Sequence, residues 1–141
     1  AEYTHAVFST ALDPNVFVLR LVPGMRADII PLLEGRYRAL VLESFGVGGL
    51  PGGDDGAMFA AVRDWCGAGH LAVFTTQVPH EGSDLAVYEV GRAAKALPSV
   101  LEAHDMTPEA TAVKLMWVLG QTTDRTEAEK LFLTPVQWDI L

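Results

Sequence analysis

The side chains best able to bind a small molecule gather in one polar segment, residues 75–84, which reads TTQVPHEGSD. This segment follows an apolar run typical of a buried β-strand, and it contains Thr76, His80 and Ser83. Parallel sheets bind ligands at the carboxyl ends of their strands, where loops and helix N-termini converge. The segment is therefore a candidate ligand site, while the same composition is equally typical of a solvated loop.

A second candidate is the glycine-rich loop 46–53, which follows another apolar run. A dinucleotide-binding G-x-G-x-x-G motif would require glycine at Pro51, and no Lys-Ser/Thr pair follows to make a phosphate-binding loop. The glycines can permit a tight turn, or they can let a ligand or a neighbouring subunit approach the backbone closely. In the latter case Ser44, Gly46 and Gly48 are candidates for binding a substrate or an effector.

No pattern typical of a metal or cofactor site is present. The histidines His5, His70, His80 and His104 form no i,i+4 pair, and one cysteine cannot build a zinc cage. No G-x-S-x-G motif marks a serine nucleophile, and Cys66 lies in a helical pattern typical of a buried, unreactive thiol. We therefore expect no metal and no cofactor, and the residues by themselves predict no complete catalytic set.

Length and charge restrict the class of protein. The 141 residues suffice for one domain with a well-buried core. Eighteen acidic against ten basic residues give a net charge of −8 without any basic run, so we expect no nucleic-acid partner. No apolar run is long enough for a membrane span, no secretion signal is visible, and a single cysteine fits a reducing compartment. These features predict a cytoplasmic protein without a membrane partner.

The sequence alternates between apolar runs typical of β-strands and patterns with the period of an α-helix, and these predict the elements that position the candidate side chains. Apolar β-type runs predict strands at residues 16–22, 39–45 and 70–76, with a brief fourth strand at 99–102. Helical patterns occupy residues 26–34, the stretch from a cap at Asp54 or Asp55 to 68, and residues 90–96, 108–120 and 126–132. Thr107-Pro108-Glu109 has the form of a helix start, and the helix that follows is apolar on most sides and should be largely buried.

Repeated β-loop-α units with short connections predict a parallel sheet covered by helices. The predicted fold class is therefore α/β, a three-layer Rossmann-like domain whose short, mostly parallel sheet has about four strands. We expect residues 1–141 to form this one domain.

Four stretches, in the right order, resemble the C-terminal domain of bacterial type I (cytoplasmic) L-asparaginases. They are residues 22–25 (VPGM), 39–51 (ALVLESFGVGGLP), 82–91 (GSDLAVYEVG) and 104–111 (HDMTPEAT) followed by Lys114-Leu115. The last stretch is the most specific, because Asp-Met-Thr ahead of Glu-Ala and a Lys-Leu helix is a hallmark of the family. The match covers nearly all of this chain but less than half of such an enzyme.

This resemblance implies hydrolysis of L-asparagine to L-aspartate and ammonia without a cofactor. The family's nucleophilic threonine, its second threonine and their aspartate and lysine belong to an N-terminal domain that these residues do not contain. The isolated domain should therefore be inactive. It would complete the neighbouring subunit's active site and build a homo-oligomer, a dimer or a tetramer, with Tyr88 reaching towards the partner's site or lying at the dimer contact.

Two positions depart from the family pattern. Some members bind asparagine at an allosteric pocket through an arginine where this chain has Glu43, and a carboxylate cannot make that bidentate contact. Members often have Asn where this chain has Gly49, so an amide donor is absent there. Three alternatives stay open: a glutaminase, an asparaginase-like amidotransferase subunit, and a stand-alone module for small-amino-acid binding or assembly.

Overall fold

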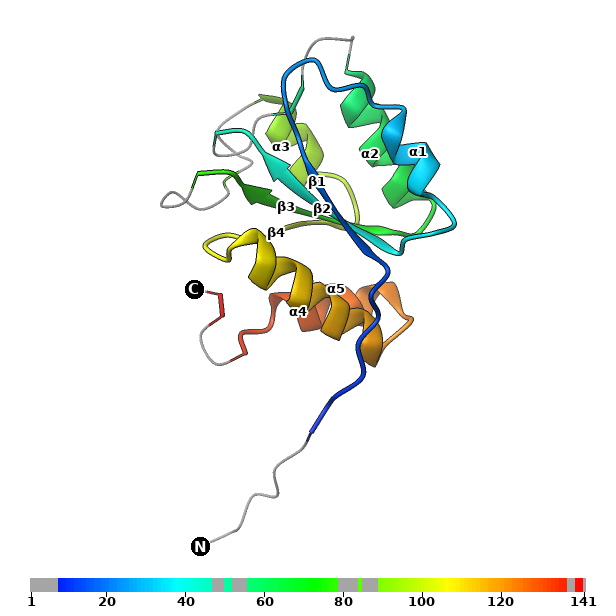
Figure 1. Cartoon of the computed structure of the whole chain (residues 1–141), viewed down its shortest axis with the longest axis vertical. Coiled ribbons are helices and arrows are strands. Elements are labelled where there is room, and N and C mark those ends of the chain that lie inside the picture. Colours follow the sequence, from blue (N-terminus) through cyan, green and yellow to red (C-terminus); the bar gives the residue numbers. More distant parts are fainter. Residues whose placement is uncertain are drawn as a thin grey trace, which may run out of the picture.

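A computed structural model describes residues 8–46, 50–51, 56–78, 84, 89–136 and 139–140, and Figure 1 labels its helices and strands. The four strands are β1 (Val16–Arg20), β2 (Ala39–Ser44), β3 (Leu71–Thr76) and β4 (Val100–Glu102). They form one sheet in the order β1-β2-β3-β4, and all neighbouring strands run parallel. The predicted α/β class with a four-stranded parallel sheet is confirmed.

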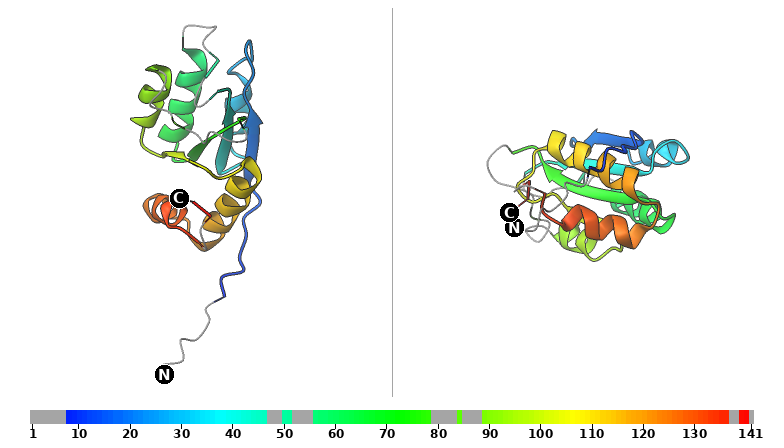
Figure 2. Two further views of the ribbon diagram at one scale, coloured as in Figure 1. Left: turned by 90° about the vertical axis from the view of Figure 1, so that its left-hand side faces the viewer. Right: turned by 90° about the horizontal axis from the view of Figure 1, so that it is seen from below.

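Helices cover both faces of this sheet. They are α1 (Ile29–Leu33), α2 (Ala57–Gly67), α3 (Glu89–Lys95), α4 (Pro108–Gln121) and α5 (Arg125–Leu133). Helices α1, α2 and α3 lie above the strands in Figure 1, and α4 and α5 lie below them. The view from below in Figure 2 shows α4 and α5 crossing the near face of the sheet. The three predicted layers are therefore present.

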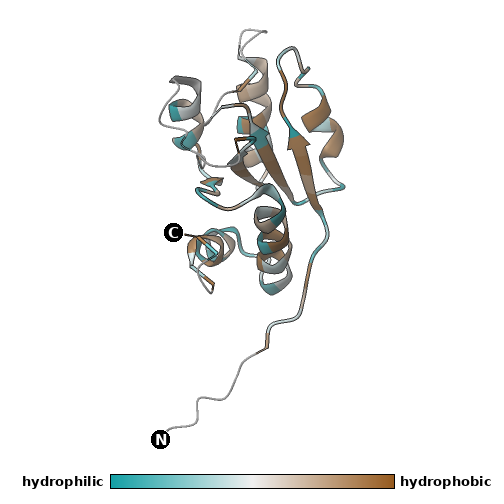
Figure 3. Ribbon diagram, turned by 60° about the vertical axis from the view of Figure 1, so that its left-hand side comes forward, coloured by the Kyte–Doolittle hydropathy of each residue, from teal (hydrophilic) through white to brown (hydrophobic). Residues whose placement is uncertain are grey.

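Side-chain alternation along the central strands explains the two cores. In β2, Ala39 and Val41 belong to the core under α4 and α5, whereas Leu40 and Leu42 belong to the core under α1 and α2. All six residues of β3 are buried. Strands covered on both faces are expected to be apolar throughout, as Figure 3 shows for the centre of the sheet.

Two predicted helix starts are wrong. Helix α1 begins at Ile29 instead of residue 26, because Pro31 has no N–H for the carbonyl of Ala27 and its ring would clash there. The N-cap of α2 is Gly56 instead of Asp54 or Asp55. Gly56 has φ +77°, a left-handed conformation that glycine adopts without steric cost.

Helix α4 confirms its predicted start and most of its predicted burial, but a strip that includes Val113 is exposed. Thr107 is the N-cap, and its hydroxyl accepts a 3.2 Å hydrogen bond from the backbone N–H of Ala110, with Pro108 at the first helical position. Leu115 and Val118 are fully buried, whereas Val113 is 60% exposed. One face of this apolar helix is therefore left uncovered. None of the described helices has the length and hydropathy needed to cross a membrane.

Candidate ligand site at the carboxyl ends of the strands

A cavity of about 300 Å³ opens where β1, β2 and β3 end, beside the N-terminus of α4. The strand register brings the ends of the three strands to the same edge of the sheet, because Arg20 of β1 pairs with Glu43 of β2, which pairs with Thr75 of β3. The residues after β3, and residues 105–109 before and within α4, complete the lining. This edge of the sheet is the one at which open parallel sheets bind ligands.

Gln77 organises the floor of this cavity. Its side-chain Nε2 donates to the backbone carbonyls of Leu21 and Glu43, at 2.7 and 2.8 Å. Its Oε1 accepts a 3.1 Å hydrogen bond from Nε of Arg20. One amide therefore ties the ends of β1 and β2 together and fixes the Arg20 side chain.

The cavity carries both signs of charge. Nε of Arg20 lies 3.8 Å from Oε2 of Glu43, and Arg20 is two-thirds exposed whereas Glu43 is mostly buried. Asp105 and Glu109 add two exposed carboxyl groups at the cavity. Its described lining contains two threonines but neither histidine nor lysine. This arrangement can hold a small polar ligand, and its described part offers carboxylates but neither histidine nor lysine as a base.

Three of the predicted site residues fall within the described part of the chain. Thr76 lines the cavity, and its hydroxyl donates to the carbonyl of Gly46. Gly46 is an exposed residue with φ +59°, two positions after the end of β2. Ser44 is fully buried, and its hydroxyl donates a 2.9 Å hydrogen bond to the carbonyl of Thr75. This hydroxyl therefore links β2 to β3 instead of facing the cavity.

The other predicted site residues, Gly48, His80, Ser83 and Tyr88, lie outside the described residues. Conversely, Arg20 lines the cavity although no sequence pattern indicated it, and Gln77 lines it although only the segment that contains it, and not this residue, was singled out. Arg20 lies at the end of a predicted strand, and Gln77 lies near the start of the polar segment. Their convergence depends on the registers of β1 with β2 and of β2 with β3, which the sequence pattern does not specify.

The described part of the chain shows neither a cluster of metal ligands nor a reactive thiol. It contains no group of three or more His, Cys, Asp or Glu side chains that could hold a metal ion. Cys66 is buried, as predicted, and burial raises the pKa of its thiol to about 12. A thiol with so high a pKa carries almost no thiolate at neutral pH and is a poor nucleophile.

Gln77→Glu should lower the free energy of unfolding by about 1–2 kcal/mol at pH 7, because the introduced carboxylate would face two carbonyl oxygens instead of donating to them. The loss should shrink in part below about pH 5, where the introduced group is protonated and its one O–H can donate to one of the two carbonyls. Urea unfolding at both pH values measures this. Ala93→Glu, at an exposed position of α3, is the matched control and should show no such recovery.

Comparison with known proteins gives the site its context. Residues 15–132 match the family model described as the glutaminase/asparaginase C-terminal domain. The chain is 40% identical over 125 residues to an L-asparaginase of Thermococcus kodakarensis, a match covering 89% of this chain and 37% of that protein. It is 36% identical over 123 residues to a glutamyl-tRNA(Gln) amidotransferase subunit of Metallosphaera sedula, covering 86% of this chain and 27% of that protein.

The fold agrees with these matches. The structure of the thermostable L-asparaginase from Thermococcus kodakarensis superposes with a TM-score of 0.83 at 38% identity, over 93% of this chain and 39% of that one. The chain thus spans well under half the length of the relatives it matches. Because the family model covers most of the chain, this protein belongs to the glutaminase/asparaginase C-terminal domain family.

Proposed function

We propose that the chain is the C-terminal domain of a type I, cytoplasmic L-asparaginase, which hydrolyses L-asparagine to L-aspartate and ammonia. The observation that carries this proposal is the 40% identity to an L-asparaginase of which the chain spans only 37%. The hallmark stretch 104–111 supports it, since it forms one wall of the cavity and the start of α4.

In this proposal the covalent chemistry belongs to the preceding domain. A threonine hydroxyl there attacks the side-chain amide, assisted by a second threonine, an aspartate and a lysine. The described cavity fits a supporting role, because its lining lacks a histidine or lysine base. The present domain would complete the neighbouring subunit's active site, with Tyr88 as an auxiliary group, and would build a dimer or a tetramer.

The carboxyl-end cavity is the proposed contact with a small amino acid. An amino acid carries a carboxylate and an ammonium group, and the cavity offers the Arg20 guanidinium for the first and the Glu43 carboxylate for the second. Thr76 and Gly46 would supply hydrogen bonds around it, and Gly48, His80 and Ser83, which lie outside the described residues, stay candidates from the sequence alone. Calorimetric titration of the chain with L-asparagine measures whether it binds without the preceding domain.

The purified 141-residue chain should release no ammonia from L-asparagine above the buffer rate, because the nucleophile and its base are in the preceding domain. The longer polypeptide, expressed by extending the reading frame upstream, is the positive control and should hydrolyse asparagine. Turnover by the 141-residue chain itself would contradict the proposed division of labour.

A second candidate is a subunit of a tRNA-dependent amidotransferase, favoured by the 36% identity to a glutamyl-tRNA(Gln) amidotransferase subunit. The same longer polypeptide distinguishes the two candidates. Ammonia release from free asparagine favours the asparaginase. Glutamine-dependent amidation of charged tRNA, together with an additional N-terminal domain, favours the amidotransferase.

A further inference from the structure

Helix α4 presents an apolar groove to solvent on the side away from the sheet. The groove has a volume of about 440 Å³, and its walls include Leu12, Val113, Trp117 and Val136. Leu12 is 61% exposed, Val113 60% and Val136 44%. Contiguous exposed apolar surface of this kind is typical of a site covered by another protein surface.

One wall of the groove is an extended segment, residues 8–15, which we call the strap. Figure 1 shows it running in blue from β1 alongside α4. Nε1 of Trp117 donates to the carbonyl of Ser9 at 3.1 Å, and Nε2 of Gln121 donates to the carbonyl of Ala11 at 2.8 Å. The backbone N–H of Asp13 donates to the carbonyl of Met116 at 2.9 Å. The strap is therefore fastened to α4 along its length.

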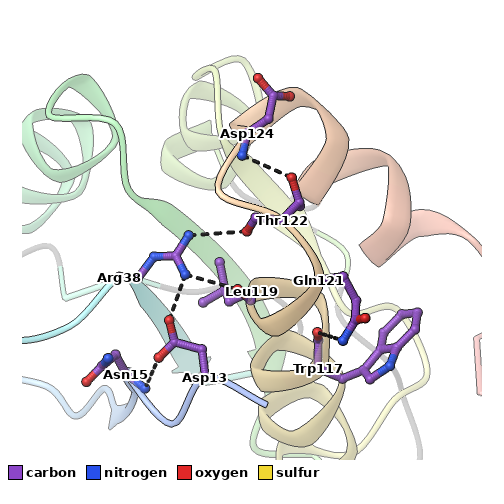
Figure 4. Close-up of polar contacts among 8 residues, drawn as sticks. All are labelled: Asp13, Asn15, Arg38, Trp117, Leu119, Gln121, Thr122 and Asp124. Carbon is purple, nitrogen blue, oxygen red and sulfur yellow. Dashed lines mark hydrogen bonds and ion pairs between the residues drawn. The ribbon is translucent and has the colours of Figure 1, made fainter. Parts of the chain in front are cut away.

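Arg38 fastens the strap to the end of the same helix. One guanidinium nitrogen donates to Oδ2 of Asp13 at 2.6 Å and to the carbonyl of Leu119 at 3.0 Å, and the other donates to the carbonyl of Thr122 at 3.3 Å. Figure 4 shows the guanidinium between these groups. A cation suits the carbonyl-rich C-terminal end of a helix, so this contact holds the strap in one position.

The strap also leaves apolar side chains uncovered. Phe8 is 84% exposed and Leu12 61%, although the backbone between them is bound to α4. Lys114 and Asp139, the polar residues of the groove, are paired with each other at 2.8 Å. The groove therefore offers apolar contact without an unpaired charge among its described residues, which suits a permanent, largely apolar interface.

We propose that the groove is the docking surface for the domain that precedes residue 1 in the same polypeptide. This inference rests on the proposed function, which requires such a domain. The relatives carry most of their length outside the matched C-terminal region, 63% in the case of the asparaginase, since the chain spans 37% of it. In this proposal the additional chain would join the present domain on the N-terminal side of the strap, whose backbone is held against α4 beside the groove.

The test compares the 141-residue chain with the longer polypeptide extended upstream in its reading frame. Hydroxyl-radical footprinting read by mass spectrometry measures the labelling of Leu12, Val113 and Trp117 in both forms. Labelling should fall by about threefold or more in the longer polypeptide, at every protein concentration used, because interface cores exclude water. Val113→Asp should leave the melting temperature of the 141-residue chain unchanged and lower that of the longer polypeptide. Leu32→Asp, at a 71% exposed position on α1, is the matched control.

Each other outcome has a separate meaning. Unchanged labelling in a longer polypeptide that hydrolyses asparagine overturns the docking surface and leaves the proposed function standing. Protection that appears only as protein concentration rises shows that a second copy covers the groove, and it also overturns the inference. An upstream reading frame that encodes no further domain overturns the inference and the proposed function together.

Discussion

Gly120→Ala should lower the free energy of unfolding by about 2–3 kcal/mol, although alanine normally stabilises a helix relative to glycine. A Cβ atom at position 120 would lie 2.3 Å from the carbonyl oxygen of Ala11 and 2.8 Å from the backbone nitrogen of Leu12. Both obstacles are backbone atoms, so the strap would have to move as a whole and would lose its hydrogen bonds to α4. Chemical denaturation of the two proteins measures the difference.

Gly67→Ala is the matched control for this change. Gly67 is also helical, at the end of α2, and a Cβ atom there would meet nothing within 4 Å. This variant should be as stable as the parent or slightly more stable. Hydrogen exchange gives a second measurement, since only Gly120→Ala should accelerate exchange of the Asp13 amide, which is bonded to the carbonyl of Met116. Equal behaviour of the two variants would show that the strap is not held at Gly120.

Lys114→Met should cost about 2–4 kcal/mol of unfolding free energy, because it breaks a largely buried ion pair from one side. The Lys114 side chain is 5% exposed, and its Nζ lies 2.8 Å from Oδ2 of Asp139 and 3.0 Å from the carbonyl of Thr134. Without the ammonium group, the segment after α5 loses both contacts with α4. Lys130→Met, at an exposed position of α5, should change stability by less than about 0.5 kcal/mol.

The effect of Lys114→Met should depend on pH. Burial by itself would raise the pKa of Asp139, but hydrogen bonds from Lys114 and from the backbone N–H of Val136, with the Lys114 charge, outweigh it and hold this pKa below 3.8. A lowered folded-state pKa stabilises the protein above the unfolded-state value, and this stability is lost as pH falls through the folded-state value. The stability gap between parent and variant should therefore narrow from pH 6 to pH 3. A double-mutant cycle with Asp139→Asn that shows no coupling would contradict this account.

The sequence predicted strands and helix starts correctly where a short local pattern is enough to specify them. The runs that became β2 and β3 are nearly continuous in apolar residues, and Thr107-Pro108 starts α4 as predicted. The predicted starts of two helices were wrong, because a single proline or glycine near the helix start moved the boundary. Pro31 delays the start of α1 to Ile29, and Gly56 replaces the aspartates as the cap of α2. These errors concern boundaries, and they do not change the order of elements.

The candidate site was predictable only in part. Thr76 was predicted because it ends an apolar run, and it does line the cavity. Arg20 and Gln77 are 57 positions apart, and their 3.1 Å hydrogen bond exists because β1 pairs with β2, and β2 with β3, in one particular register. A periodic pattern specifies which face of a strand is buried, but it does not specify which residues of two strands lie opposite each other.

By itself, then, the sequence determined the α/β class, the alternation of strands and helices and the family to which the domain belongs, because these depend on local periodicity and on contiguous motifs. Only the tertiary structure decided that one face of α4 stays open and that Gly120 must be glycine. It also decided that Lys114, a charged residue on an apolar helix, is buried against Asp139. Each of these depends on contacts between segments distant along the chain, which no local pattern encodes.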